Sequence, residues 1–231
     1  MNVTLIRHTL SPEELVALGA RLCYSRTTLD DLQERVSSHD QTEYVGRIMS
    51  MGHDSVLEHA SFTFGIEGVS RALLAQITRH RLASFSVQSQ RYVSYRNGVF
   101  GFVIPPKIAA LGESACAEFA RQMDIMNRWY NGWLDMLDNK YGKGDNEEDA
   151  RFVLPNACET RMMVTMNVRE LRHFFSLRCC NRAQWEIRAL ADEMLRRCKE
   201  VAPLLFADAG PGCVRGHCPE GEKSCGKGRM A

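Results

Sequence analysis

Two rhythms of apolar residues run along this chain and predict its secondary structure. Alternating, β-branched stretches are typical of strands, and they occur at residues 2–8, 60–67 and 161–167. Helical patterns, most of them with apolar residues three or four positions apart, cover residues 12–23, 29–36, 42–51, 69–78, 107–141, 169–178 and 183–201. This mixture predicts an α+β fold, in which a mixed or mainly antiparallel sheet is flanked by helices.

Local signals mark several helix ends. Ser11, Pro12 and Glu14 have the pattern of a capping box with proline at the first helical position, so the first helix is expected to begin there. Gly52 is expected to end the third helix, because glycine readily adopts the left-handed conformation found at helix ends. The long pattern over residues 107–141 is expected to form one amphipathic helix.

Composition indicates a globular chain with a distinct tail. Apolar residues make up 45% of it, which is ordinary for a protein with a hydrophobic core. Residues 1–209 are expected to form a single domain, and residues 210–231 a tail rich in glycine and cysteine. The formal net charge is only +1, so a site for anions has to be local, and a nucleic-acid partner is not expected.

Signals for membranes and for secretion are missing from the sequence. No apolar stretch approaches the roughly 20 residues needed to cross a bilayer, so no membrane partner is expected. Residues 1–7 do not have the pattern of a signal peptide. The nine cysteines are odd in number, and Cys179 and Cys180 are adjacent, which favours reduced thiols and a cytoplasmic location.

Residues 79–92 form the densest polar run in the chain. Three arginines, one histidine, three serines and two glutamines lie within these fourteen positions, directly after a predicted helix, and the run is expected to form a loop. Arginine binds phosphate oxygens with two parallel hydrogen bonds, and serine hydroxyls add further donors. The run therefore predicts a site for a phosphorylated, planar ligand. The alternatives are a solvated basic loop, or a loop paired with Asp and Glu residues elsewhere in the chain.

The same run resembles the signature of the flavin-dependent thymidylate synthases. The pattern R-H-R-x-x-S-x-x-x-x-S-x-R is met by Arg79, His80, Arg81, Ser84, Ser89 and Arg91. The segments at residues 52–59, 62–64 and 171–187 also resemble that family, in the same order, so the resemblance covers most of residues 1–206. It implies reductive methylation of dUMP to dTMP, with methylenetetrahydrofolate as one-carbon donor, FAD as hydride carrier and NADPH as reductant. It further implies a homotetramer whose active sites are shared between subunits.

The resemblance also implies which residues bind the ligands. It assigns dUMP to Gln76, Arg79, Val87, Gln88, Ser89, Gln90, Arg91, Arg151 and Arg178. It assigns FAD to His53, Ser55, Glu58, Arg79, His80, Arg81, Val87, Asn167, Val168, Arg169 and His173. Two positions depart from the family: Val87 is usually polar, and some relatives carry histidine in place of Arg182. Arg172 is expected to be ordinary surface charge.

Arg178 is the residue expected to carry the chemistry. Uracil is an imide, and its ring becomes reactive when charge develops on the N–C=O unit. A fixed guanidinium directed at that unit stabilises the transition state more than the ground state. Leu177 and Arg178 match the family's Leu-Arg pair, whose arginine is thought to activate dUMP.

Other interpretations remain open at this stage. The chain could be a flavin- or nucleotide-binding module without thymidylate activity, and a salt-dependent nucleic-acid-binding protein is a further alternative. Ser89 as the nucleophile of a hydrolase has little support, because no G-x-S-x-G elbow is present. In the tail, Cys213, His217, Cys218 and Cys225 could ligate zinc, but their spacing is not that of a standard motif, so reduced thiols and no metal are expected.

Overall fold

The computed structural model describes residues 1–96 and 98–228, and these divide into two compact units. The first unit contains Met1–Asn2, Ile66–Ile77 and Ser86–Met162. The second contains Val3–Gly65, Thr78–Phe85 and the described chain from residue 163 onwards. A single domain over residues 1–209 stays a prediction, as does a separate tail, whose last three residues lie outside the described part.

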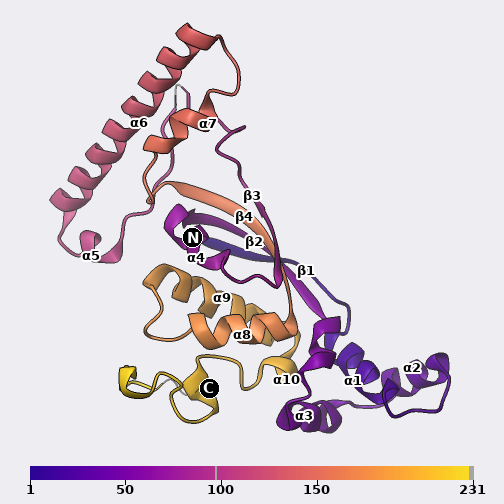
Figure 1. The fold of residues 1–231 in the computed structure, drawn as a ribbon. Helices are drawn as coiled ribbons and strands as arrows, with labels where there is room; N and C mark the ends of the chain where they lie inside the picture. The colour runs from indigo at the N-terminus through magenta and orange to yellow at the C-terminus, as the bar shows by residue number, and fades with distance from the viewer. Residues whose placement is uncertain (97, 229–231) are drawn as a thin grey trace. The chain divides into compact units, whose positions relative to one another are not determined.

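Four strands form one antiparallel sheet, which confirms the α+β fold (Figure 1). They are β1 (Asn2–His8), β2 (Ser61–Ser70), β3 (Ala83–Val87) and β4 (Glu159–Asn167), in the order β1-β2-β4-β3. The three predicted strands are all present, and β4 alternates between buried and more exposed positions over nearly its whole length. This alternation of buried and exposed side chains produces the period-two pattern that predicts a strand from the sequence.

β3 corrects the prediction that the whole polar run is a loop. It is formed by the middle of the run, where Ala83, Phe85 and Val87 are half-buried and the two serines between them are exposed. The alternation is real but covers only five residues, and the surrounding arginines and glutamines obscure it. Pairing with β4 extends beyond the strand, because the Gln88 N–H donates to the Arg161 carbonyl at 3.0 Å.

The second unit begins with three helices: α1 (Pro12–Leu22), α2 (Leu29–Ser37) and α3 (Thr42–Met51). α3 ends as predicted at Gly52, which is left-handed with φ 69°. The prediction of a capping box at Ser11 is wrong, although the helix does begin at Pro12. Ser11 is itself left-handed (φ 43°), and its side chain makes no capping bond.

The later helices of the second unit are α8 (Val168–Arg178), α9 (Trp185–Val201) and α10 (Pro203–Phe206). α8 and α9 pack side by side (Figure 1). Three fully buried rings join β2, α8 and α10, because Phe206 contacts Phe62 and Phe175 edge-on, with ring centroids 5.6 and 6.0 Å apart. This aromatic cluster anchors α8 through Phe175, and α8 is the helix that carries much of the candidate site.

The first unit contains α4 (Arg71–Ile77), α5 (Pro106–Ala109), α6 (Glu113–Tyr141), α7 (Glu147–Ala150) and the 3-10 turn η2 (Arg151–Val153). α4 is shorter than predicted, because Val69 belongs to β2. The predicted helix over residues 107–141 is two helices. α5 ends at Ala109, and Gly112, directly before α6, has φ 104°, a non-helical conformation that separates the two helices.

Removal of the Phe206 ring is expected to destabilise the protein strongly. Phe206→Ala should lower the free energy of unfolding by about 3–5 kcal/mol, because it leaves a cavity against Phe62 and Phe175. The matched control is Leu10→Ala, since Leu10 is 86% exposed and should change stability little. Denaturant unfolding measures both, and equal stability of the two variants would contradict the role of the aromatic cluster.

Candidate functional site

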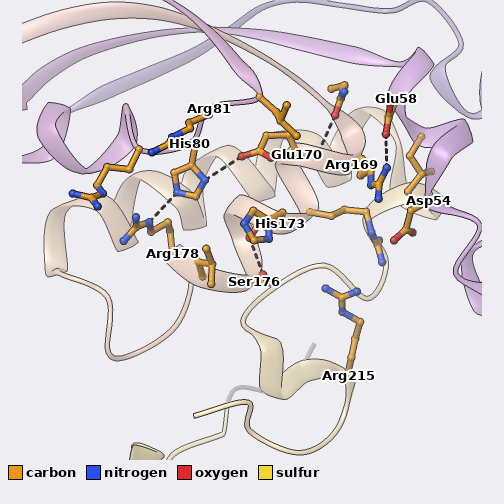
Figure 2. A pocket seen from close by; sticks show the side chains of 16 residues that line it. Asp54, Glu58, His80, Arg81, Arg169, Glu170, His173, Ser176, Arg178 and Arg215 are labelled. Carbon is orange, nitrogen blue, oxygen red and sulfur yellow. Dashed lines mark hydrogen bonds and ion pairs between the residues drawn. The ribbon is translucent and has the colours of Figure 1, made fainter.

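A pocket of about 780 Å³ in the second unit gathers much of the predicted chemistry (Figure 2). Its walls come from the 3-10 turn η1 (Asp54–His59), the chain between α4 and β3, helix α8, and Arg215 in the tail turn η3 (Gly212–Arg215). Six arginines line it: Arg79, Arg81, Arg169, Arg172, Arg178 and Arg215. Only three carboxylates do so, namely Asp54, Glu58 and Glu170. The pocket is therefore cationic in a chain that is nearly neutral.

Three of these arginines have carboxylate partners. Arg169 pairs with Glu58, and the buried Arg172 binds Asp208 with two bonds of 2.8 and 3.0 Å. Arg215 lies 3.9 Å from Asp208 as well. Burial is the largest single effect and would raise the pKa of Asp208, but the hydrogen bonds from Arg172 and the charges of Arg172 and Arg215 together outweigh it and lower that pKa. Arg172 is thus not the surface charge that was predicted, because it ties α8 to the chain after α10.

The other three arginines form the candidate anion site. Within the described residues, Arg79, Arg81 and Arg178 form no ion pair with a carboxylate. Burial lowers the pKa of Arg178, and the charge of Arg79 lowers it further. Placing like charges together is unfavourable unless an anion offsets them. These three guanidinium groups are therefore the part of the pocket best suited to a phosphorylated ligand.

A buried hydrogen-bonded chain holds Arg178. Its Nε donates to Nε2 of His80 at 3.0 Å, and Nδ1 of His80 lies 3.1 Å from Oε1 of Glu170 (Figure 2). Because a guanidinium only donates, Nε2 must accept, so the proton of the neutral ring is on Nδ1 and is donated to Glu170. His80 and Glu170 are each only 5% exposed. The chain fixes the position of Arg178 from inside the protein.

The electrostatics keep His80 neutral. Burial is the largest effect and lowers the pKa of His80, and the nearby cation of Arg178 lowers it further. The hydrogen bond to Glu170 acts in the opposite direction but does not outweigh burial. A neutral ring is what the Arg178 bond requires, since a protonated His80 would have no acceptor to offer.

The sequence at the start of α8 explains how Glu170 is positioned to contact His80. Asn167 caps α8, and its side chain accepts the Glu170 N–H at 2.8 Å. The Val168 N–H donates to the Ala60 carbonyl at 2.9 Å, and the Val168 side chain is fully buried. With the start of α8 fixed, Arg169 and His173 face the pocket one turn apart, as predicted, and both line it.

The pocket brings together eight of the predicted site residues: Glu58, Arg79, His80, Arg81, Asn167, Arg169, His173 and Arg178. His53 and Ser55 lie next to it in sequence but outside its lining. Sequence reasoning missed Glu170, whose carboxylate in a helical pattern looks like ordinary surface charge. The signal that could have found it is its place three residues after the Asn167 cap, on a face of α8 rich in apolar residues.

Of the predicted dUMP residues, Arg79 and Arg178 lie in the second unit, and all the others lie in the first. Arg91 pairs with Glu148 at 2.9 Å, and Nε of Arg151 donates to the Glu148 carbonyl at 3.0 Å, so the structure brings these two arginines to one residue. Arg71, which was not predicted, donates to the Gln88 carbonyl at 2.8 Å.

The other predicted residues of this unit make local contacts. Ser89 Oγ accepts the Arg91 N–H, Gln90 donates to Cys158 Sγ at 3.5 Å, and Gln76 donates to the Ala72 carbonyl at 3.3 Å. Val87, the departure from the family, is half-buried at the end of β3. Ligand contacts by these residues stay predictions.

Among residues 1–96 and 98–228, no three His, Cys, Asp or Glu side chains are grouped so that they could hold a metal ion, the tail cysteines included. In the same part of the chain, every helix is too short or too polar to cross a bilayer.

The fold and the pocket define an α+β protein whose clustered guanidinium groups are suited to anionic ligands. The family model described as "Thymidylate synthase complementing protein" matches residues 4–204. A relative from Geobacter sulfurreducens named "Flavin-dependent thymidylate synthase" is 55% identical over 227 residues, which cover 98% of this chain and 94% of the relative. Relatives with the same name from Clostridium tetani and Pyrococcus furiosus are 46% and 39% identical, over 98% and 95% of this chain and 94% and 90% of their own lengths.

The chain belongs to the flavin-dependent thymidylate synthase family. The resemblance seen in the sequence is thereby confirmed, and the alternative of a binding module without thymidylate activity is not favoured.

The neutral state of His80 leads to a prediction about stability and pH. In the unfolded chain His80 takes up a proton near its ordinary pKa of 6.5, whereas the folded protein resists protonation. The unfolded state therefore binds more protons as the pH falls below about 6.5, and the free energy of unfolding should decrease there, no more steeply than about 1.4 kcal/mol per pH unit for one proton. His80→Gln should remove this part of the pH dependence.

Denaturant unfolding between pH 5 and pH 8, a range set around the ordinary histidine pKa of roughly 6.5, measures the effect. His217→Gln is the matched control, because His217 is exposed in the tail and should leave the pH dependence unchanged. A stability difference between wild type and His80→Gln that stays constant with pH would contradict the neutral assignment.

Proposed function

We propose that this chain catalyses the reductive methylation of dUMP to dTMP through the cationic pocket around Arg178. Methylenetetrahydrofolate supplies the one-carbon unit, and NADPH supplies the reducing equivalents. The observation that carries the proposal is the set of three guanidinium groups, Arg79, Arg81 and Arg178, that share one pocket without carboxylate partners in the described residues. The chain belongs to a family whose substrate is a nucleoside monophosphate.

The residues of the pocket fit FAD. The cofactor carries two phosphates, and guanidinium groups bind such oxygens bidentately. Arg81 and Arg169 would hold the pyrophosphate, and His173 and Glu58 would contact the polar edges of the cofactor. The volume of about 780 Å³ is within the range of cofactor sites. When bound, FAD supplies the hydride chemistry, and the protein supplies binding, orientation and electrostatics.

Arg178 is proposed to polarise the uracil ring. Its Nε is occupied by His80, which leaves the two Nη groups for the N–C=O unit of dUMP. A guanidinium held in this way needs little reorganisation when charge develops on the ring, so it stabilises the transition state. His80 and Glu170 act through Arg178 and are positioning residues.

Binding of dUMP is proposed for Arg79 in the second unit and, on the family resemblance alone, for Arg91 and Arg151 in the first unit. Arg91 and Arg151 both contact Glu148, which orders their side chains and partly offsets their charge. Ser89 and Gln90 are proposed to contact the nucleotide alongside them, and Gln88 through its backbone. The family resemblance supports these roles, as it supports Gln76.

The assembly is proposed to be a homotetramer with shared active sites, in the cytoplasm. Closed symmetry would repeat a composite site in every subunit. None of the nine cysteines, all of which lie within the described chain, forms a disulfide, which fits a reducing compartment.

Replacement of Arg178 tests the central role. Arg178→Ala should lower kcat by about 100- to 1000-fold or more, because a preorganised charge at the reacting ring is lost. The purified variant should stay yellow, since FAD is held by other residues. Steady-state formation of dTMP and the flavin absorbance spectrum measure the two effects.

The control for this variant is Arg128→Ala, which removes an exposed arginine paired with Asp124 on α6 and should keep full activity. Turnover of Arg178→Ala at the wild-type rate would refute the catalytic role. A variant that is colourless and inactive would show instead that Arg178 is needed to hold FAD.

The positioning role of Glu170 makes a second prediction. Glu170→Ala leaves Nδ1–H of His80 buried without a partner, so Arg178 loses its fixed place, and kcat should fall by up to about 100-fold while KM for dUMP changes little. Glu170→Gln keeps an acceptor oxygen and should restore most of the activity. Equal losses in the two variants would show that charge, not positioning, is what Glu170 contributes.

A further inference from the structure

A second pocket in the same unit collects thiols. It has a volume of about 470 Å³ and lies between the C-terminal end of α8 and the tail. Four of its lining residues are cysteines: Cys180, Cys213, Cys218 and Cys225. Ser176, Leu177 and Arg178 line both this pocket and the cationic one, so the thiols lie close to the catalytic arginine.

The tail is held at this place by the residues that follow α8. Arg182 donates to the Lys223 carbonyl at 2.7 Å, and Asn181 donates to the Lys227 carbonyl at 2.9 Å. These bonds use backbone carbonyls on either side of Cys225 and fix that part of the tail beside α8. Arg182, which departs from some relatives, thus has a structural partner in the tail.

Cys225 has the surroundings of a reactive thiol. The Lys227 N–H donates to its sulfur at 3.4 Å, and Asn181 Nδ2 donates at 3.7 Å. The turn that returns the Lys227 N–H to the sulfur requires Gly226, which has φ 67°. The backbone bond from Lys227 and the bond from Asn181 favour the thiolate and lower the pKa of Cys225.

Other cysteines of the chain differ in ways that make them poor reaction sites or useful controls. Burial raises the pKa of Cys158 and Cys198, and both are fully inaccessible. Cys23 is exposed on the surface and donates to the Gly19 carbonyl, outside the lining of the thiol pocket. Accessibility, thiolate-stabilising donors and companion thiols occur together at Cys225.

We infer that Cys225 is a thiol-modification site that reacts with low-molecular-weight disulfides and is resolved by a second cysteine of the same pocket. In the first step the Cys225 thiolate attacks one sulfur of R–S–S–R, the S–S bond breaks, and the leaving thiolate takes up a proton. In the second step Cys180, Cys213 or Cys218 gives up its proton and attacks the Cys225 sulfur of the mixed disulfide, the bond to the R–S group breaks, and the leaving R–S⁻ takes up that proton. The balance is one protein dithiol and one R–S–S–R converted into one protein disulfide and two R–SH.

Full-length reduced protein with glutathione disulfide as the probe tests the inference. Mass spectrometry should show a loss of two hydrogens, and peptide mapping should find Cys225 linked to Cys180, Cys213 or Cys218. Iodoacetamide should alkylate Cys225 at least about threefold faster than Cys23, because its thiolate is favoured. Cys225→Ser should abolish the disulfide, and the matched control Cys23→Ser should form it as wild type does.

Several results would overturn the inference. Alkylation of Cys225 no faster than of Cys23 would remove its special reactivity, and a glutathione adduct that persists without an internal disulfide would remove the resolving thiol. Zinc bound one-to-one in wild type and lost in Cys225→Ser would make the pocket a metal site instead. These readouts do not use dTMP formation, so they are independent of the proposed function.

Discussion

The buried chain from Glu170 through His80 to Arg178 is the interaction on which the site depends. Burial disfavours the charge of the Arg178 guanidinium, and the neighbouring charge of Arg79 disfavours it further. The neutral imidazole of His80 gives Arg178 an acceptor without adding a charge, and Glu170 fixes which nitrogen of that ring accepts. The Arg178 cation is thus held in place through its Nε alone, and its two Nη groups are left for a ligand.

The first turn of α8 explains how the chain builds this arrangement. Asn167 accepts the backbone N–H of Glu170 and so fixes the start of the helix, while the Glu170 side chain reaches His80. At the next turn, the buried Arg172 binds Asp208 and the Leu205 carbonyl. One face of α8 is therefore anchored in the protein, and Arg169 and His173 are left to the pocket. A shift of one residue in the helix start would place every one of these side chains wrongly.

Most of the fold could be predicted from sequence, because strands and helices with strongly periodic apolar residues can be recognised from that pattern. The failures have local physical causes. β3 is short and lies among arginines and glutamines, Gly112 divides a helix whose apolar face runs on across the break, and Ser11 adopts a left-handed conformation that no capping pattern reveals. The candidate site was found through its arginines. Glu170 and Arg172 were not, because burial of a charged residue depends on partners distant in sequence.

The contacts of the tail also could not be predicted from sequence, because they involve residues distant along the chain. Cysteine spacing alone suggested either zinc or ordinary reduced thiols, and neither interpretation involved α8. Only the structure places Cys225 beside Asn181 and connects Arg182 to the Lys223 carbonyl. Arg215 then lines the cationic pocket from the same tail. A segment that looked like an appendage in sequence therefore supplies walls to two pockets, and the residues between α8 and α9 are the attachment point that makes this possible.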